Sequence, residues 1–262
     1  MAMSKYLDVF RFSVRDQTAY LPAFMARNLF FVVILFVFFS LWRVVFAESG
    51  VIAGFTIVQT LWYLTFTEAI ELSRSSVLQT VQADVKDGTI AYDLTRPYSY
   101  VVFSLARGVG EAVAKLALVL VVGFVVATVF VGPLPGYFSA LPFGVLGIFG
   151  GIVLNVLWHL VIALLAFWTE EVMPFHWILQ KLVFILGGMF FPIEFFPDWL
   201  ARIARVLPFA FSAYWPARTM VAFSFDGFLV AVVGQAIYIG VLLALALGIF
   251  ALAKRRVHAH GG

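Results

Sequence analysis

Cysteine and charged residues are what this sequence has least of. None of its 262 residues is a cysteine, and only 12% are charged. Without cysteine the chain has no disulfide framework, no Cys-ligated zinc or iron–sulfur site and no thiol chemistry. A soluble globular domain typically carries charge on about a quarter of its residues. The charge content therefore excludes that class of protein.

Motifs of ATP binding and hydrolytic chemistry are also missing. The chain contains no Gly-Lys pair, and therefore no G-x-x-x-x-G-K-[ST] loop to hold the phosphates of ATP. Neither HExxH nor G-x-S-x-G occurs. Glu170, Glu171 and His176 lie close in sequence, but their spacing matches no metal-binding motif, and solvated charges are the favoured interpretation. We expect a chain that is not itself an enzyme and binds no metal.

Hydrophobic residues make up 63% of the sequence and occur in long runs. A helix that spans a bilayer needs about 20 such residues. Basic residues stand at the ends of the runs, where they fit the positive-inside rule rather than nucleic-acid binding. The predicted fold class is an all-α polytopic membrane protein, a single transmembrane domain over residues 1–262. Its six predicted spans are residues 24–47, 51–70, 101–131, 141–168, 175–191 and 228–253.

Residues 1–22 have the pattern of an amphipathic helix. Tyr6 and Phe10 fall on one helical face, and Lys5 and Arg11 lie elsewhere. This pattern predicts a helix that lies in the headgroup plane of a membrane. A plain membrane anchor and a contact with a partner protein both remain open.

The basic residues predict the orientation. With six spans, both termini and residues 71–97 lie on one side of the membrane. Ten Lys and Arg residues near span ends fall on that side and four on the other, which places both termini in the cytoplasm. The ten are Lys5, Arg11, Arg15, Arg27, Arg74, Lys86, Arg96, Lys254, Arg255 and Arg256, and the four are Arg43, Arg202, Arg205 and Arg218.

Residues 71–97, ELSRSSVLQTVQADVKDGTIAYDLTRP, form the longest polar segment between the apolar runs. Residues 80–86 are predicted to be helical. Gly88 allows a sharp turn after that helix, and Pro97 stops any helix before the third span begins. The segment must lie in water, where a partner protein can grip it.

A catalytic interpretation of this segment fails. Asp87-Gly88-Thr89-Ile90-Ala91 is similar to the opening D-G-x-x-A-R motif of CDP-alcohol phosphotransferases, which hold metal ions with aspartates. The next residue is Tyr92 rather than Arg, and the downstream Gly and two Asp residues are missing. The carboxylates that such an enzyme needs for its ions are therefore absent.

Residues 192–221 are neither a clean span nor a clean loop. Pro192, Pro197, Pro208 and Pro216 divide them into short pieces, and Asp198 is expected to cap a short helix. Broken helices at membrane depth occur only where they are buried in protein or line a wet cavity. We predict re-entrant helices between the fifth and sixth spans.

Polar side chains within the predicted spans are costly in lipid and therefore informative. Gln59, Thr60, Asn155 and His159 are candidates for lining a substrate path. For Asn155, His159 and Gln235, hydrogen bonds between helices are the favoured interpretation.

Charged residues near the ends of the spans have simpler expected roles. Glu68 and Glu71 are expected to contact water or a partner. Glu111 and Lys115 stand four apart in the order that favours an ion pair along one helical face, near the membrane interface.

Two stretches resemble one known family. D-G-T-I-A-Y-D-L-T-R-P, residues 87–97, resembles a signature of the viologen-exporter-like subfamily of ABC-2 type transporter permeases, formerly a domain of unknown function. G-G-M-F-F-P-I-E-F-F-P-D-W-L-A-R-I-A-R-V-L-P-F, residues 187–209, is similar to a stretch of ABC-2 permeases generally. The second stretch is the more specific, and neither identifies a cargo.

The resemblance implies one half of the membrane domain of an exporter. Two separate ATPase subunits would bind ATP and Mg, and a second permease, identical or paralogous, would complete the complex. The cargo would be hydrophobic or amphipathic and the location a bacterial or archaeal cytoplasmic membrane. Arg96 is placed to pair with Asp93 or with the ATPase.

The resemblance also implies roles for particular residues. Residues 71–97 would contain the helix that couples to the ATPase, through Gln82, Asp84, Lys86, Asp87, Gly88, Asp93, Arg96 and Pro97. The re-entrant helices would form an external gate that contains Gly187, Gly188, Pro192, Glu194, Pro197, Trp199 and Pro208.

Two other classes of function remain open. An ion-gradient-driven secondary transporter needs buried carboxylates near mid-membrane and usually inverted repeats. Here Glu68, Glu111, Glu170 and Glu194 fall near span ends, and the two halves show no repeat. A non-transporting membrane scaffold predicts no ATPase partner.

Overall fold

Helices make up almost all the regular structure of the computed structural model, which describes residues 4–17, 21–169 and 171–260. The long helices are α2 (Leu21–Val45), α6 (Tyr100–Val131), α7 (Tyr137–Leu164) and α12 (Phe225–His260). Those of intermediate length are α1 (Ser4–Gln17), α3 (Ile57–Leu72) and α8 (Met173–Leu186). The short elements are β1 (Val51–Ile52), β2 (Phe55–Thr56), α4 (Val77–Lys86), α5 (Ile90–Leu94), η1 (Leu165–Phe167), η2 (Ile193–Phe195), α9 (Asp198–Val206), α10 (Pro208–Ser212) and α11 (Tyr214–Val221).

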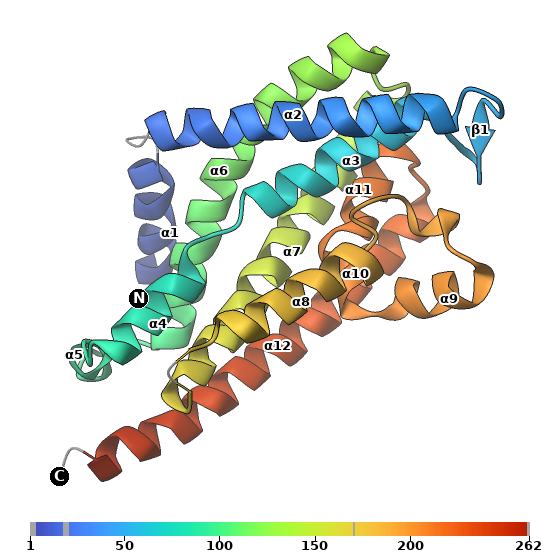
Figure 1. The fold of residues 1–262 in the computed structure, drawn as a ribbon. Helices are drawn as coiled ribbons and strands as arrows, with labels where there is room; N and C mark the ends of the chain where they lie inside the picture. Colours follow the sequence, from blue (N-terminus) through green and yellow to red (C-terminus); the bar gives the residue numbers. More distant parts are fainter. Residues whose placement is uncertain (1–3, 18–20, 170, 261–262) are drawn as a thin grey trace.

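Helix α7 is the centre around which the others pack. Over the stretch that is long enough to span a bilayer, 72% of its residues are buried, against 22% in each of α2, α6 and α12. Helices α4, α6, α11 and α12 all contact it, and Figure 1 shows α12 running along its side. Leu154, Leu157 and Leu160 are fully buried in the resulting core.

The six predicted spans correspond to six helices, of which four are long and apolar enough to cross a membrane on their own: α2, α6, α7 and α12. Helices α3 and α8 have 16 and 14 residues, or about 24 and 21 Å at the rise of an α-helix. A bilayer core is about 30 Å thick, so neither crosses it unaided. Length and composition therefore support four candidate spans among the described residues.

The boundaries of the two shorter helices differ from the prediction for a local reason. Val51 to Thr56 form an antiparallel hairpin instead of the first turns of a span. Thr56 and Gln59 then close a capping box that starts α3 at Ile57. Helix α8 ends at Leu186, so residues 187–191 of the predicted fifth span lie outside it.

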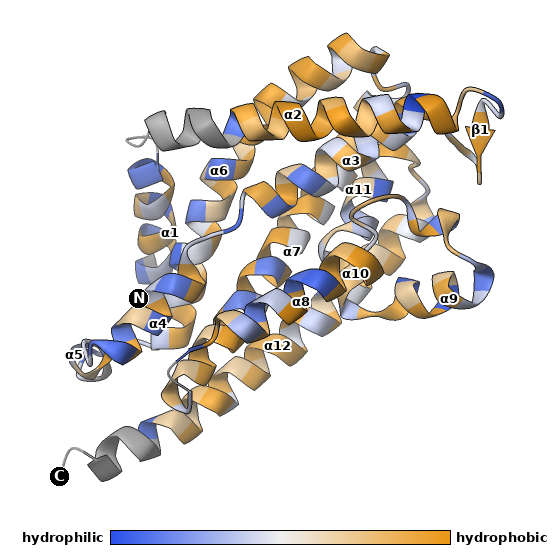
Figure 2. Cartoon of the chain, in the orientation of Figure 1, coloured by the Kyte–Doolittle hydropathy of each residue, from blue (hydrophilic) through white to orange (hydrophobic). Residues whose placement is uncertain are grey.

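Apolar side chains cover the outside of the long helices. Figure 2 shows hydrophobic residues along α6, α12 and the described part of α2. Phe36, Val121, Val129 and Val241 are among the exposed ones. Soluble proteins rarely expose contiguous apolar surface of this extent, so these faces fit lipid or an apolar partner. The chain is a multi-pass membrane protein.

Helix α1 lies against α6 and is the described part of the predicted amphipathic segment; residues 1–3 and 18–20 of that segment lie outside the described residues. Ser13 is buried while Arg11 is exposed, as a one-sided helix requires. The contact is close because α6 has Gly110 there. A Cβ at Gly110 would stand 2.6 Å from the carbonyl oxygen of Phe10.

Replacement of Gly110 tests this contact. We expect Gly110→Val to displace α1 and to destabilise the protein by about 1–3 kcal/mol, because the new side chain has no room. Thermal unfolding in detergent and hydrogen exchange of the α1 amides measure the effect. Gly248→Ala is the control, because a Cβ there meets nothing within 4 Å. Unchanged protection of α1 in Gly110→Val would contradict the packing.

Candidate functional site

The polar segment forms a short amphipathic helix followed by a sharp turn. Helix α4 begins at Val77, three residues before the predicted start, and its apolar face, with Leu78 and Val81, is buried. This face packs on α7 and η1. Gly88 has a φ of +72°, a conformation that glycine adopts without strain, and the chain reverses there into α5. The predicted helix and turn are confirmed.

A buried carboxylate holds the start of α4 on α6. Glu111 accepts hydrogen bonds from the backbone N–H of Ser76 at 3.1 Å and from its hydroxyl at 2.8 Å. The Nζ atom of Lys115 lies 2.5 Å from the same carboxylate and also donates to the carbonyl oxygen of Arg74 at 3.2 Å. The predicted Glu111–Lys115 pair is therefore confirmed. Sequence spacing could not indicate Ser76, since the segment folds back across 35 residues to reach Glu111.

Two further contacts fix the body of α4. The hydroxyl of Tyr100, in the first turn of α6, donates to Asp84 at 2.7 Å. Gln82 donates to Glu171 at 3.0 Å, and Lys86 pairs with the same carboxylate at 3.5 Å. The backbone N–H of Met173 and the amide of Gln82 lower the pKa of Glu171 from its usual value, because both donate to the charged form.

The remaining predicted coupling residues lie at an exposed tip, residues 86–97. Lys86, Asp87, Gly88, Arg96 and Pro97 are exposed there, and Asp93 is partly buried. Arg96 pairs with Asp93 at 3.6 Å, as predicted. Gln82, by contrast, is buried, and Asp84 is partly buried.

The tip also presents an aromatic residue that sequence reasoning missed. The side chain of Tyr92 is 74% exposed, although α5 has only five residues. The sequence did not predict this exposure. Tyr92 lies near Ile90 in a stretch that mixes apolar and polar residues, so it could fall on either the buried or the exposed face of a short helix. An exposed aromatic side chain among charged ones is typical of protein contacts.

The tip is further bound to α1. Lys5 donates to the carbonyl oxygen of Pro97 at 2.7 Å, and the hydroxyl of Tyr6 accepts from the backbone N–H of Ser99 at 3.0 Å. Helix α1 therefore contacts both α6 and the end of the polar segment.

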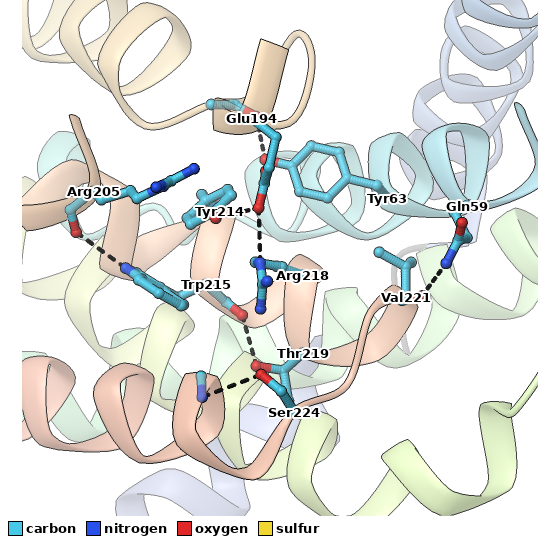
Figure 3. A network of polar contacts seen from close by, with 12 residues as sticks. Gln59, Tyr63, Glu194, Arg205, Tyr214, Trp215, Arg218, Thr219, Val221 and Ser224 are labelled. Atoms are coloured by element: carbon cyan, nitrogen blue, oxygen red, sulfur yellow. Dashed lines mark hydrogen bonds and ion pairs between the residues drawn. The ribbon is translucent and has the colours of Figure 1, made fainter. Parts of the chain in front are cut away.

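The predicted gate residues follow α8 and meet α3 and α11 (Figure 3). Glu194 accepts hydrogen bonds from Tyr214 at 2.7 Å and from the Nε atom of Arg218 at 2.8 Å. The hydroxyl of Tyr63, in α3, donates to the carbonyl oxygen of Gly188. Gly188 has a φ of +70°, which favours glycine.

Three of the four prolines of this region stand at the starts of short helices, whereas Pro216 lies inside α11 and does not divide the chain as predicted. Pro192 precedes η2, Pro197 precedes α9, and Pro208 begins α10. Gly187 ends α8. Trp199 is exposed on α9. The predicted capping role of Asp198 is wrong: Pro197 holds the cap position, and Asp198 is already the first helical residue.

The four candidates for a substrate path lie in two pairs, Gln59 and Thr60 in α3 and Asn155 and His159 in α7. Gln59 closes the cap of α3 and donates to the carbonyl oxygen of Val221, and the buried Thr60 beside it makes no side-chain hydrogen bond with the described residues. In α7, the Nδ1 atom of His159 donates to the carbonyl oxygen of Asn155 at 2.6 Å, a bond within one helix. Their role on a path stays a prediction.

Bonds between helices are confirmed for Gln235. Its amide donates to the carbonyl oxygens of Gly147 in α7 and Phe211 in α10, at 2.8 and 3.1 Å. Three helices are thereby joined by one side chain.

Glu68 departs from one of its two expected contacts, the contact with water, while the contact with a partner stays a prediction. Its side chain is buried at 4% exposure, so it does not face bulk water. Glu71 pairs with Arg74 at 2.8 Å, and the guanidinium of Arg74 lies 3.4 Å from Nε2 of His176. Among the described residues no three Asp, Glu or His side chains are grouped as metal ligands, and Glu170 lies outside those residues.

The Glu111 contact is open to a direct test. We expect Glu111→Gln to destabilise the protein by about 3 kcal/mol, because Lys115, only 14% exposed, is left without its ionic partner. Thermal unfolding in detergent measures this loss. Arg11→Gln is the control: the Asp8–Arg11 pair is about two-thirds exposed, so its loss should change stability by less than about 1 kcal/mol. Equal effects of the two substitutions would refute the role assigned to Glu111.

Comparison with known protein families places this sequence in one of them. The family model described as "ABC-2 family transporter protein" matches residues 31–261. This range includes α4, α5 and the broken segment after α8. No curated protein matches the chain significantly. The matched range covers most of the sequence, and the chain belongs to the ABC-2 transporter family, whose members are membrane components of ABC transporters and not themselves ATPases.

Proposed function

We propose that the chain is the permease subunit of an ABC-2 type exporter. It moves a hydrophobic or amphipathic molecule across a bacterial or archaeal cytoplasmic membrane, with both termini in the cytoplasm. ATP hydrolysis on two separate ATPase subunits, which hold the ATP and Mg, drives the transport. A second permease, identical or paralogous, completes the membrane domain, and the chain itself binds no cofactor.

The observation that carries this proposal is the exposed tip and its attachment. Lys86, Tyr92 and Arg96 present charge and an aromatic ring to the outside. The helix beneath them is bonded to α6 through Ser76–Glu111 and Asp84–Tyr100. A force applied at the tip therefore reaches an apolar helix through short, charge-assisted bonds.

Helix α3 offers the route from the tip to the gate. Its last turn leads through Ser73 into α4, and its middle contacts the gate through Tyr63 and Gly188. Its first turn contacts the end of α11 through Gln59 and Val221. Because α3 is almost completely buried from Thr60 to Ile70, it moves as a unit with its neighbours. ATPase closure would tilt α3 and α6 together and release or restore the gate contacts.

Burial of Glu68 is the observation that favours an ion-gradient-driven transporter instead, since such proteins use buried carboxylates. ATP dependence separates the two functions. Transport in vesicles that persists without ATP and collapses with the proton gradient would establish the alternative. A scaffold would show no transport under either condition.

Substitution at the tip tests the docking proposal. Tyr92→Ala combined with Lys86→Glu should weaken retention of the ATPase in mild detergent and abolish permease-stimulated ATP hydrolysis, because truncation of an aromatic anchor costs about 2 kcal/mol of binding energy. Co-purification and ATP turnover in liposomes are the measurements.

The matched control is Phe138→Ala. Phe138 is 88% exposed at the opposite end of α7, so its loss should leave both measurements unchanged. Full ATPase retention by the tip variant would show that the ATPase docks elsewhere.

A further inference from the structure

One cavity of the described structure is lined by both polar and aromatic side chains. It has a volume of about 650 Å³ and lies between α2, α3, α6 and α8. Phe30, Phe38, Phe184 and Phe190 form its apolar part, and Glu68 lies in its polar part. Its volume is in the range of small-molecule sites.

Glu68 is the unusual group in this cavity. Its side chain is 4% exposed and its carboxylate makes no hydrogen bond or ion pair with the described residues. An ionised carboxylate that is buried without a partner carries a large desolvation cost. A complementary group supplied by a ligand removes that cost.

The other charged groups of the cavity are already engaged. Arg74 pairs with Glu71 at 2.8 Å, and Lys115 pairs with Glu111 at 2.5 Å. Neither cation is paired with Glu68, so the ionised form of its carboxylate has no counter-ion within the cavity. A cationic ligand fits that charge.

The hydrogen-bonding needs of the carboxylate narrow the choice of cationic ligand further. A desolvated carboxylate is stabilised most by a charged group that donates N–H bonds to it. A protonated primary amine has three such donors, whereas a quaternary ammonium has none. The four phenylalanine side chains then suit an apolar chain attached to the amine.

We propose that this cavity binds an amphiphile with a primary ammonium head, with the ammonium at Glu68 and the apolar chain along Phe30, Phe38, Phe184 and Phe190. The head belongs either to an aminophospholipid or to a simple long-chain amine. That the ligand is also the cargo rests on the proposed transport function.

Native mass spectrometry of the purified full chain tests the site without the ATPase. In each of two matched pairs of probes, three N-methyl groups replace the three N–H donors of the head: dioleoyl phosphatidylethanolamine against dioleoyl phosphatidylcholine, and dodecylamine against dodecyltrimethylammonium. We expect the wild-type chain to bind the primary amine of at least one pair at least about tenfold more tightly, the effect of one charged hydrogen bond. Preference in the phospholipid pair indicates a lipid ligand, and preference in the single-chain pair alone indicates a simple amine.

Glu68→Gln should remove the preference, because it keeps the shape and loses the charge. Asp226→Asn, which changes an exposed carboxylate in the first turn of α12, should keep it. No preference in either wild-type pair, or a preference that survives Glu68→Gln, overturns the proposal. If Glu68→Gln fails to fold, the comparison of the wild-type pairs still decides.

The cargo role has a separate readout. Addition of the preferred amine should stimulate ATP hydrolysis by the intact complex, and the matched quaternary probe should not. Binding without stimulation of ATP hydrolysis would support the binding site but overturn its role in transport. Loss of ATPase co-purification would overturn the proposed function while leaving the binding result intact.

Discussion

The carboxylate of Glu111 is the interaction on which the arrangement of the polar segment depends. It satisfies the N–H and hydroxyl of Ser76 at the start of α4 and the ammonium of Lys115 on its own helix. All three partners are largely removed from water, so each would be costly to leave unpaired. The start of α4 is thus held on the apolar helix α6, and the position of the exposed tip, residues 86–97, depends on this contact.

Helix α3 joins regions that the sequence keeps far apart. One of its ends leads to α4, its middle touches Gly188, and its start touches Val221. Its burial leaves no lipid-facing stripe between Thr60 and Ile70, which is consistent with a length too short to span a bilayer. The same burial encloses Glu68 at the edge of the amphipathic cavity. Helix α3 therefore both connects α4 to the gate and carries the carboxylate of the proposed ligand site.

Patterns local in sequence predicted much of this structure. The turn at Gly88, the Asp93–Arg96 pair, the Glu111–Lys115 pair and the breaks at Pro192, Pro197 and Pro208 all depend on neighbours within a few residues. The hairpin before α3 was missed, because Val51 and Ile52 are as apolar as the span they precede and only the Thr56–Gln59 cap separates them. The burial of Glu68 and the exposure of Tyr92 were also missed, since packing decides both.

The sequence by itself determined that the chain belongs in a membrane, where its long helices begin and end approximately, and which family its motifs resemble. Runs of apolar residues and short motifs carry this information, because each helix that spans a bilayer needs its own continuous apolar stretch. Only the tertiary structure decided which carboxylates are paired, which side chains form the tip and which helix reaches the gate. Those outcomes rest on contacts such as Ser76–Glu111 and Tyr63–Gly188, between residues 35 and 125 positions apart, and no local pattern encodes a contact that chain packing creates.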